Sequence, residues 1–402
     1  MNITYIHQYF KTPDEPGGTR SYWISQELIR AGHTVTMITS GPAEQVGKID
    51  RKNIDGINVI YIRNPYDQRF SVLRRLISFI SFMFRATRVL FRQKNTDLVI
   101  ATSTPLTVGI PPMIFKSLRK KPYLFEVRDL WPEVPIQMGA LNNSAVRTLA
   151  LKLESVIYKN AMHIIALSPG MQEGVVKVVA DPAKVSMVPN MAKNDKFWRR
   201  ERNEGLIKKL KLRKETFKLI HFGAMGRANG LDYILDAAKL LKENNVNDVE
   251  IILLGDGSET DRLVKLKEDN GLDFVHFPGA FNMAMTSEIV NLCDASIVPF
   301  LNLPVLKTNS PNKLFDSLSA GVPIIVNSDG WTKEMVEVNE CGAYVNPDDP
   351  SELCTLILEW KENKELLDRM GKNARKLAET TYDKSILCKK FVSIVHSINN
   401  QA

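Results

Sequence analysis

Short apolar runs alternate with amphipathic stretches along most of the chain. Runs of four to eight apolar residues predict buried strands, and apolar residues that recur every three or four positions predict helices. This alternation indicates a doubly wound α/β fold with parallel sheets. The expected strands lie at residues 3–10, 34–40, 58–64, 97–103, from 123, 163–168, 184–190, from 218, from 249, 274–281, 295–300, 323–328 and from 342.

The pattern stops once and then restarts, which divides the chain in two. Residues 192–205 carry many charges and no apolar periodicity, as expected of a linker between domains. A chain of 402 residues is also longer than one typical domain. We therefore expect one Rossmann-like domain at 1–190, a second at 191–381, and a helical tail at 382–402.

Two glycines stand at the first strand-to-helix turn. Gly17 and Gly18 precede a helix that is expected from about Thr19 to Arg30. Glycines in such a turn let the backbone approach a ligand closely. Because an adjacent pair is less specific than G-x-G-x-x-G, a plain turn is the alternative interpretation.

The segment 306–326 combines a turn, a short helix and a strand. We expect Ser310 to cap the helix and Pro311 to lie in its first turn. Unpaired N–H groups at a helix start attract anions such as phosphate, and Lys313 adds a full charge there. Asp316, one turn further on, is placed to accept two ribose hydroxyls. The alternative is an ordinary helix whose lysine and aspartate are solvated.

A glycine-rich turn also opens the second domain. Gly223, Gly226 and Gly230 are spaced three and four residues apart, which fits neither G-x-G-x-x-G nor a P-loop. Arg227 lies within this turn and can reach a phosphate. The turn therefore predicts a contribution to anion binding, without the signature of a dinucleotide site.

Charged residues follow one strand of the first domain. The strand from Tyr123 ends in R-D-L-W-P-E, which contains Asp129 and Glu133. Ligands of open parallel sheets bind at the carboxyl ends of the strands, so both carboxylates are candidates for function. The alternative is a salt-bridged loop.

The segment 68–96 has the most unusual composition in the chain. It contains seven basic residues and no acidic one. As a helix it would carry a cationic stripe between broad apolar surfaces, which favours a membrane interface. A buried crossover helix with arginines reaching out to solvent is the alternative. The stripe consists of Arg74, Ser78, Ser81, Arg85, Arg88 and Arg92.

The composition limits the possible binding partners and the cellular compartment of the protein. A net charge of +8 suits nucleic acid, an anionic membrane or phosphorylated substrates. Nucleic acid is disfavoured, because the aromatic residues of the basic segment lie on its apolar side. No run of about 18 apolar residues predicts a membrane span, and the first ten residues lack the pattern of a secretory signal. The four cysteines are far apart, as expected of reduced thiols, so we expect a cytoplasmic protein.

Several chemistries lack their motifs. The chain contains no H-E-x-x-H, no zinc-ligand spacing, no G-x-x-x-x-G-K-[ST] and no G-x-S-x-G. Asp-x-Asp is also absent, which disfavours a diphosphate held through a chelated metal. We therefore expect neither a metal nor any other cofactor.

Five motifs occur in a fixed order along nearly the whole chain: EPGGTRSYW, NMAKNDKF, HFGAMGRANGLDYIL, LLGDGSE and SPNKLFDSLSAGVPIIV. Together they resemble the motifs of family 4 glycosyltransferases of the GT-B fold, and in particular bacterial O-antigen and capsule enzymes of the N-acetyl-L-fucosamine transferase type. The resemblance implies two Rossmann-like domains that face each other across a cleft. It also implies metal-independent transfer of a sugar, with retention, from a nucleotide diphosphate donor.

The resemblance further implies roles for individual residues. Gly17 and Gly18 would lie by the donor sugar and diphosphate, and Asp129 would lie in the loop that reaches the donor sugar. The backbone of Leu314 would donate to phosphate, and Asp316 matches the second glutamate of a motif that binds ribose hydroxyls. The candidate donor-binding residues are Gly17, Gly18, Gly223, Arg227, Asn312, Lys313, Leu314 and Asp316, and the candidate catalytic residues are Asp129, Glu133 and Lys313.

Three positions depart from the family pattern. Thr308 stands where the first glutamate of that motif is expected, and Ala224 and Asn229 replace an arginine and a lysine of the glycine-rich turn. A cation near the departing diphosphate is needed wherever it lies in the chain, because it stabilises the developing charge. We therefore assign this charge to Lys313 and Arg227.

The expected protein is thus a peripheral enzyme on the inner face of the plasma membrane. It would take a UDP-sugar, most simply an N-acetylated one, and a polyprenyl-diphosphate-linked acceptor in O-antigen or capsule biosynthesis. Its final helix, from Tyr382, would cross back onto the first domain. Two alternatives remain: a UDP-sugar 2-epimerase of the same fold, and a non-catalytic membrane-associated subunit. The residues expected to contact the membrane or acceptor are Arg74, Arg85, Arg88 and Arg92.

Overall fold

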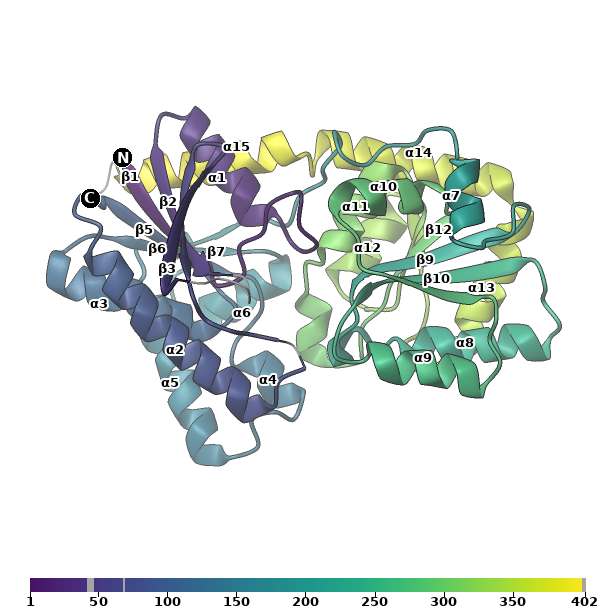
Figure 1. Cartoon of the computed structure of the whole chain (residues 1–402), viewed down its shortest axis with the longest axis horizontal. Helices are drawn as coiled ribbons and strands as arrows, with labels where there is room; N and C mark the ends of the chain where they lie inside the picture. The colour runs from purple at the N-terminus through teal and green to yellow at the C-terminus, as the bar shows by residue number, and fades with distance from the viewer. Residues whose placement is uncertain (42–46, 68, 400–402) are drawn as a thin grey trace. The chain divides into compact units, whose positions relative to one another are not determined.

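The computed structural model describes residues 1–41, 47–67 and 69–399, which form two compact units (Figure 1). Each unit is built on a mainly parallel sheet with helices beside it, so the predicted α/β fold class is confirmed. Unit 1 contains residues 1–12, residues 19–189 and the chain from Ser385 onward, and unit 2 contains Pro13–Gly18 and Asn190–Lys384.

The described part of unit 1 contains an eight-stranded sheet in the order β3-β4-β2-β1-β5-β6-β7-β8. Neighbouring strands are parallel, except that β3 and β4 are antiparallel. The order reverses beside β1, and ligands of such sheets bind outside the carboxyl ends of the strands at that point. The strands are β1 (Asn2–Ile6), β2 (Thr34–Ser40), β3 (Ile49–Ile54), β4 (Ile57–Ile62), β5 (Leu98–Thr102), β6 (Tyr123–Val127), β7 (His163–Ala166) and β8 (Val185–Met187).

Strand β3 is absent from the predicted elements. It joins β4 through a turn at Asp55 and Gly56, whose φ angles are 49° and 87°. Positive φ at both positions is typical of the two-residue Asp-Gly hairpin turn. The strand itself is charged and mostly exposed, so it lacks the apolar run by which a buried strand is recognised.

Helices α2, α3, α5 and α6 share one hydrophobic core with the sheet of unit 1. Their buried side chains include Phe82, Phe115, Ile157 and Met171. Helix α15 carries His396, which lies against His33 with 2.9 Å between the two Nε2 atoms. The helices are α1 (Arg20–Arg30), α2 (Val72–Phe91), α3 (Ile110–Arg119), α4 (Glu133–Gln137), α5 (Ser144–Asn160), α6 (Pro169–Val179) and α15 (Lys384–Asn399), with short 3₁₀ turns η1 (Leu106–Gly109) and η2 (Pro182–Lys184).

The described part of unit 2 contains a six-stranded, all-parallel sheet in the order β11-β10-β9-β12-β13-β14. Its order reverses at β9, which places β9 and β12 at the switch point. The strands are β9 (Phe217–Ala224), β10 (Val249–Asp256), β11 (Val275–Gly279), β12 (Ala295–Val298), β13 (Ile324–Val326) and β14 (Gly342–Tyr344).

Helix α11 is the most deeply buried helix of the site in unit 2. Every residue from Lys313 to Ala320 is buried, and the helix packs against β12, β13, α10 and α14. The helices are α7 (Glu204–Lys209), α8 (Asp232–Glu243), α9 (Thr260–Asp269), α10 (Met283–Asn291), α11 (Asn312–Ala320), α12 (Trp331–Val338), α13 (Pro350–Glu362) and α14 (Lys364–Thr380), with 3₁₀ turns η3 (Arg227–Asn229) and η4 (Pro304–Thr308).

The predicted capping role of Ser310 is wrong. The residue that precedes α11 is Pro311, and no side chain caps the helix. The Ser310 hydroxyl instead accepts a hydrogen bond of 3.2 Å from the backbone N–H of Asn190. The start of α11 is therefore left with free N–H groups, which suits an anion.

Gly255 lies at the carboxyl end of β10, where the backbone of β9 approaches it closely. Its φ is +142°, and a Cβ atom there would lie 1.8 Å from the carbonyl oxygen of Gly223 on β9. We expect Gly255→Ala to destabilise unit 2 by more than about 3 kcal/mol, because the two strand ends must separate. Gly279→Ala is the control: its φ is +89°, yet nothing lies within 4 Å of the added Cβ. Equal losses of thermal unfolding midpoint in the two variants would contradict the packing argument.

Candidate functional site

The site in unit 2 is built around the buried side chain of Lys313. Its Nζ donates a 2.9 Å hydrogen bond to Oδ1 of Asn229 and lies 3.3 Å from Nε2 of His221. A Cβ atom at Gly223 would lie 3.5 Å from Cε of Lys313. The glycine-rich turn and the start of α11, predicted separately as anion sites, therefore meet at Lys313.

The charge of Lys313 has no carboxylate partner among residues 1–41, 47–67 and 69–399. Burial lowers the pKa of Lys313 from 10.5 to about 7. Burial and then the charge of Lys313 lower the pKa of His221 well below its usual value, so the imidazole is neutral and can accept from the ammonium group. A buried cation held only by neutral groups is strongly stabilised by an incoming anion.

The backbone at the start of α11 adds donors to this charge. The N–H groups of Asn312 and Lys313 have no acceptor among the described residues, as expected of the first turn of a helix. The N–H of Leu314 instead donates to the carbonyl of Pro311 at 3.2 Å. In this structure the donors available to an anion thus lie one and two residues before the residue implied by the resemblance.

Asp316 is buried on the same helix and is already paired. Its Oδ1 accepts a hydrogen bond from Nζ of Lys193 in a buried ion pair. Burial raises the pKa of Asp316, and the Lys193 ammonium opposes that rise. Lys193 is not among the predicted site residues, because it lies in a stretch interpreted as a solvated linker.

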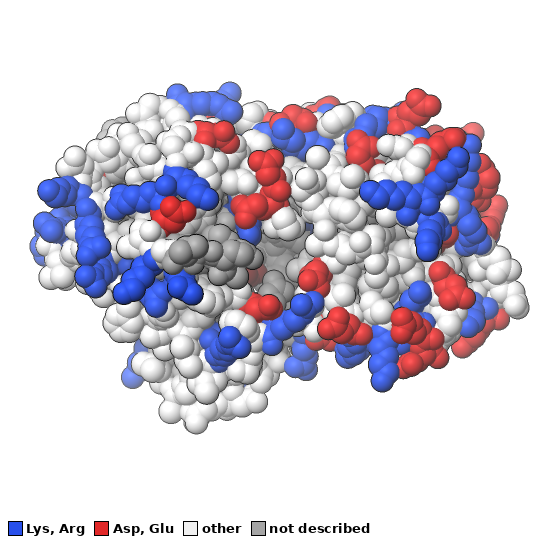
Figure 2. Space-filling model, in the orientation of Figure 1, with Lys and Arg blue, Asp and Glu red and all other residues white. Residues whose placement is uncertain are grey.

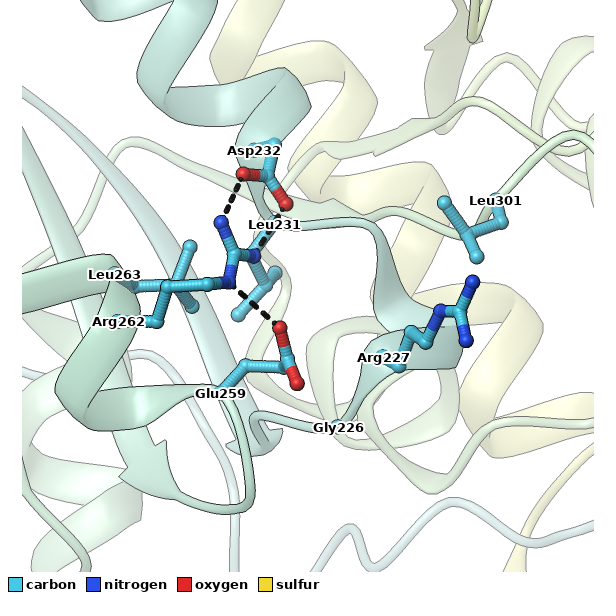
Figure 3. A pocket seen from close by; sticks show the side chains of 8 residues that line it. All are labelled: Gly226, Arg227, Leu231, Asp232, Glu259, Arg262, Leu263 and Leu301. Atoms are coloured by element: carbon cyan, nitrogen blue, oxygen red, sulfur yellow. Dashed lines mark hydrogen bonds and ion pairs between the residues drawn. The ribbon is translucent and has the colours of Figure 1, made fainter. Parts of the chain in front are cut away.

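Arg227 lines a cavity of about 370 Å³ to which Lys313 does not contribute. Figure 3 shows its guanidinium pointing toward Leu301, whereas Arg262 on α9 points toward Asp232 and Glu259. Arg262 bonds both carboxylate oxygens of Asp232 at 2.7 Å and Oε2 of Glu259 at 2.8 Å. Arg227 is exposed and forms no ion pair with a described residue, so it is available to a ligand.

Thr308, Ala224 and Asn229, the three residues that depart from the family pattern, all have uncharged side chains. Thr308 ends η4, and its hydroxyl donates a 2.7 Å hydrogen bond to the carbonyl of Val305. Ala224 is exposed at the end of β9, and Asn229 is the residue that holds Lys313. Lys313 therefore brings a cation to the turn that lacks one of its own.

Gly17 and Gly18 lie in the loop Pro13–Gly18. Gly17 is exposed with φ of +129°, a conformation that residues with a Cβ rarely adopt, and Gly18 is partly buried. The glycine at position 17 is therefore required by the backbone itself.

In unit 1, Asp129 and Glu133 follow β6 on separate elements. Asp129 is the second residue after the strand, whereas Glu133 begins α4 and accepts a 2.6 Å hydrogen bond from Nε2 of Gln137. Burial raises the pKa of Asp129 to about 6, partly offset by Arg128. Neither carboxylate forms an ion pair with a described residue, so the salt-bridged loop considered as an alternative is wrong.

Next to Arg128 lies a buried histidine, His7, that the sequence did not indicate. Nδ1 of His7 lies 2.7 Å from the Ser21 hydroxyl, and Arg128 donates to Nε2 of His7 at 3.1 Å. Burial lowers the pKa of His7 well below its usual value, so the neutral ring can accept from Arg128. His7 directly follows β1 at the switch point, and that position is the signal that could have identified it.

The predicted cationic stripe of α2 is interrupted. Arg74, Arg85, Arg88 and Arg92 are exposed, but Ser78 is buried and accepts a 2.9 Å hydrogen bond from Nδ2 of Asn64. The stripe fails there because this turn of the helix faces the loop after β4. No helix in the described ranges is long and apolar enough to cross a membrane.

Comparison with known proteins places this geometry in a family. The model described as "Glycosyl transferase 4-like domain" matches residues 17–191, and "Glycosyl transferases group 1" matches residues 203–377. A curated relative, "Probable glycosyltransferase WbjE" of Pseudomonas aeruginosa, is 24% identical over 328 residues, covering 81% of this chain and 80% of the relative. The chain is a glycosyltransferase of the GT-B fold.

Solved structures share the fold of this glycosyltransferase over its full length. Sucrose-phosphate synthase from Thermosynechococcus elongatus superposes with a TM-score of 0.80 at 16% identity, covering 100% of both chains. HepE from Anabaena in complex with UDP-glucose gives 0.73 at 18% identity, covering 99% of this chain and 100% of that one. The expected GT-B architecture is confirmed, and the family assignment favours an enzyme over the non-catalytic subunit.

We expect Lys313 to lower the free energy of unfolding of the enzyme, because its ammonium group is buried. Below about pH 7 the folded protein must bury the ammonium group, and this cost falls as the pH rises toward 10.5, the pKa of a solvated lysine. We expect Lys313→Met to raise the thermal unfolding midpoint by roughly 2–4 °C at pH 7, with a gain that shrinks toward pH 10. Lys307→Met, which removes a surface ion pair with Asp329, serves as the control. A gain that is equal at both pH values would contradict this account.

Proposed function

We propose that the enzyme transfers a sugar, with retention of anomeric configuration, from a UDP-sugar donor to a lipid-linked sugar acceptor. The observation that carries the proposal is the buried ammonium group of Lys313, which has no carboxylate partner in the described part of the chain and stands at the free N–H groups of α11. A diphosphate fits this arrangement, because it offers several anionic oxygens to one cation and adjacent backbone donors.

The identity of the nucleotide part is supported by Asp316 and by the structural relatives. A carboxylate one turn after a phosphate-binding helix start is placed to accept ribose hydroxyls. HepE, which shares the fold, is described in complex with UDP and with UDP-glucose. Within this proposal the sugar is an N-acetylated one of the L-fucosamine type, which the motifs of the chain favour.

The reaction in this proposal needs no nucleophile from the protein. The bond between the anomeric carbon and the diphosphate oxygen breaks, and the acceptor hydroxyl oxygen bonds to the same face of that carbon. The acceptor proton passes to the departing diphosphate. Lys313 stabilises the charge that develops there, an effect often worth about 3 kcal/mol. Asp129 is assigned to the donor sugar and Glu133 to the acceptor side.

The acceptor is assigned to a membrane surface because of the outer faces of α2 and α5. Both helices expose large apolar side chains, including Phe84 and Leu149, which are 67% and 68% exposed. The exposed charged residues of both helices are all basic. Figure 2 shows lysines and arginines gathered over unit 1, next to a broad uncharged surface in the region of α2 and α5. Apolar surface combined with positive charge suits an anionic bilayer.

A membrane-binding surface is also consistent with a lipid-linked acceptor. A polyprenyl diphosphate holds its sugar at the inner leaflet, so an enzyme that extends O-antigen or capsule chains must work there as a peripheral protein. WaaG, which shares the fold with a TM-score of 0.68 at 16% identity, is described as a glycosyltransferase involved in lipopolysaccharide biosynthesis.

Binding of UDP tests the donor site. We expect Lys313→Ala and Asp316→Ala each to weaken UDP binding by about tenfold or more and to abolish transfer, because each removes a buried charged contact. Isothermal titration calorimetry measures the binding, with Lys307→Ala as the control. Unaltered UDP binding in both site variants would mean that the donor site lies elsewhere.

Sedimentation with anionic liposomes tests the membrane surface. Arg85, Arg88 and Arg92 changed together to Glu should abolish sedimentation, because the charge reversal repels the lipid headgroups. The matched control reverses Lys208, Lys209 and Lys211, which are exposed on unit 2. If both triple variants sediment like the wild type, α2 does not bind lipid.

The stereochemistry and metal independence of transfer are tested together. With a screen of nucleotide sugars and lipid-linked acceptor sugars, we expect turnover to persist in EDTA, and NMR of the product to show the anomeric configuration of the donor. Conversion of the donor without any acceptor would instead indicate the epimerase. Loss of turnover in EDTA that added Mg²⁺ restores would show that a metal takes part.

A further inference from the structure

The segment that follows the end of unit 1 is built into the donor site of unit 2. The chain passes from one unit to the other between Pro189 and Asn190. Three residues later, Lys193 reaches Asp316 on α11, although it lies in a stretch that reads as a solvated linker in the sequence. Lys193 is 3% exposed, so this lysine is a core residue of unit 2 rather than part of a flexible connection.

The backbone just before Lys193 is held in place by hydrogen bonds. The side-chain amide of Asn190 donates to the Ser310 carbonyl. The N–H of Ala192 donates to the Tyr382 carbonyl at 2.8 Å, and its carbonyl accepts from the N–H of Lys384 at 2.9 Å. Because these bonds fix the backbone on either side of Ala192, the ammonium group of Lys193 is placed at Asp316 with little freedom to leave it.

The two carboxylate oxygens of Asp316 differ in their hydrogen bonding. Oδ1 accepts from Lys193, whereas Oδ2 accepts no hydrogen bond from any residue of the described ranges. The side chain of Asp316 is only 12% exposed, so water cannot surround its carboxylate. A buried carboxylate with one free oxygen is suited to a neutral donor such as a hydroxyl group.

We propose that Lys193 is a positioning residue of the nucleotide site, which keeps Asp316 ionised through Oδ1 and leaves Oδ2 to accept the ribose hydroxyls of the donor. This inference rests on the proposed function, because it takes the ligand at Asp316 to be a nucleotide. It adds a residue to the site for which neither the motifs nor the family comparison provides a role. It also explains why a lysine side chain is buried at this position.

No other charged group on the elements packed against α11 replaces Lys193. On α14, Arg375 bonds the carbonyl of Ser319 at the far end of the helix. On α10, Glu288 pairs with Arg200. On α11 itself, Lys313 is occupied by Asn229 and faces His221. Without Lys193, burial alone would act on Asp316 and raise its pKa further.

The test compares UDP with 2′,3′-dideoxy-UDP between pH 6 and 9. The ratio of the two affinities reports the contribution of the ribose hydroxyls, while the titration of the diphosphate and of Lys313 affects both ligands equally. In the wild type we expect a ratio of about tenfold or more that changes little over this range. In Lys193→Met we expect a smaller ratio that rises with pH, because loss of the Lys193 ammonium leaves burial alone to raise the pKa of Asp316.

Three further variants separate this role from a merely structural one. Lys193→Arg keeps a cation and should keep the ratio, and Lys196→Met, an exposed lysine three residues on, should behave as the wild type. In Lys193→Met/Asp316→Asn both charges of the buried pair are removed together, so its thermal unfolding midpoint should exceed that of Lys193→Met. This comparison remains informative if Lys193→Met folds poorly.

The outcomes distinguish the inference from the proposed function. A wild-type ratio in Lys193→Met at every pH, or a loss that is equal at every pH, would overturn the role of Lys193 while UDP binding by the wild type stood. A double variant no more stable than Lys193→Met would also overturn it. A wild type that binds no UDP, or binds both ligands equally, would overturn the proposed nucleotide site and this inference with it.

Discussion

The buried, uncompensated charge of Lys313 is the constraint on which the site in unit 2 depends. An ammonium group without a carboxylate partner is costly inside a protein, and it is tolerated only where neighbours supply dipoles or a ligand supplies charge. Here Asn229 and the neutral ring of His221 supply the dipoles. The burial of α11 from Lys313 onward prevents the helix from turning this side chain out to solvent. The cost of burying Lys313 is thereby retained as affinity for an anion.

In unit 1, by contrast with Lys313, a buried charge is balanced by a partner of opposite sign. Arg20 and Glu126 form an ion pair in which both side chains are 1% exposed, and Arg20 also donates to the carbonyls of Val188 and Pro189. Burial acts to raise the pKa of Glu126, but the arginines and hydrogen bonds outweigh it and hold that pKa low. Three residues on, Asp129 has no such pair, and its pKa is raised. One carboxylate thus holds the end of the sheet together, and the other stays available to a ligand.

Most of the fold could be predicted from the pattern of the chain, because buried parallel strands are continuous apolar runs. Strand β3 could not, since an exposed edge strand carries no such run and its Asp-Gly turn is its main signal. Of the site, Lys313 and Asp316 could be found because a helix start after a glycine-rich loop has a recognisable pattern. His7 and Lys193 could not be found by the same reasoning. His7 belongs to no local motif, and the motif NMAKNDKF, which contains Lys193, gives no sign along the chain that this lysine reaches Asp316. The predicted capping role of Ser310 failed because α11 begins at Asn312, which puts Pro311 at the capping position and Ser310 one residue before it.

The sequence by itself determined which residue types stand at the ends of the strands, and hence the fold class and an anion site near α11. These features depend on local periodicity and on the neighbours of each residue along the chain. Only the tertiary structure decided which charges are paired. Lys193 and Asp316 are 123 residues apart in the chain, and Lys313 and His221 are 92 apart. Their contacts depend on the order of strands in the sheet, and the burial that shifts the pKa values of Lys313, Asp316 and His221 exists only once that sheet has formed.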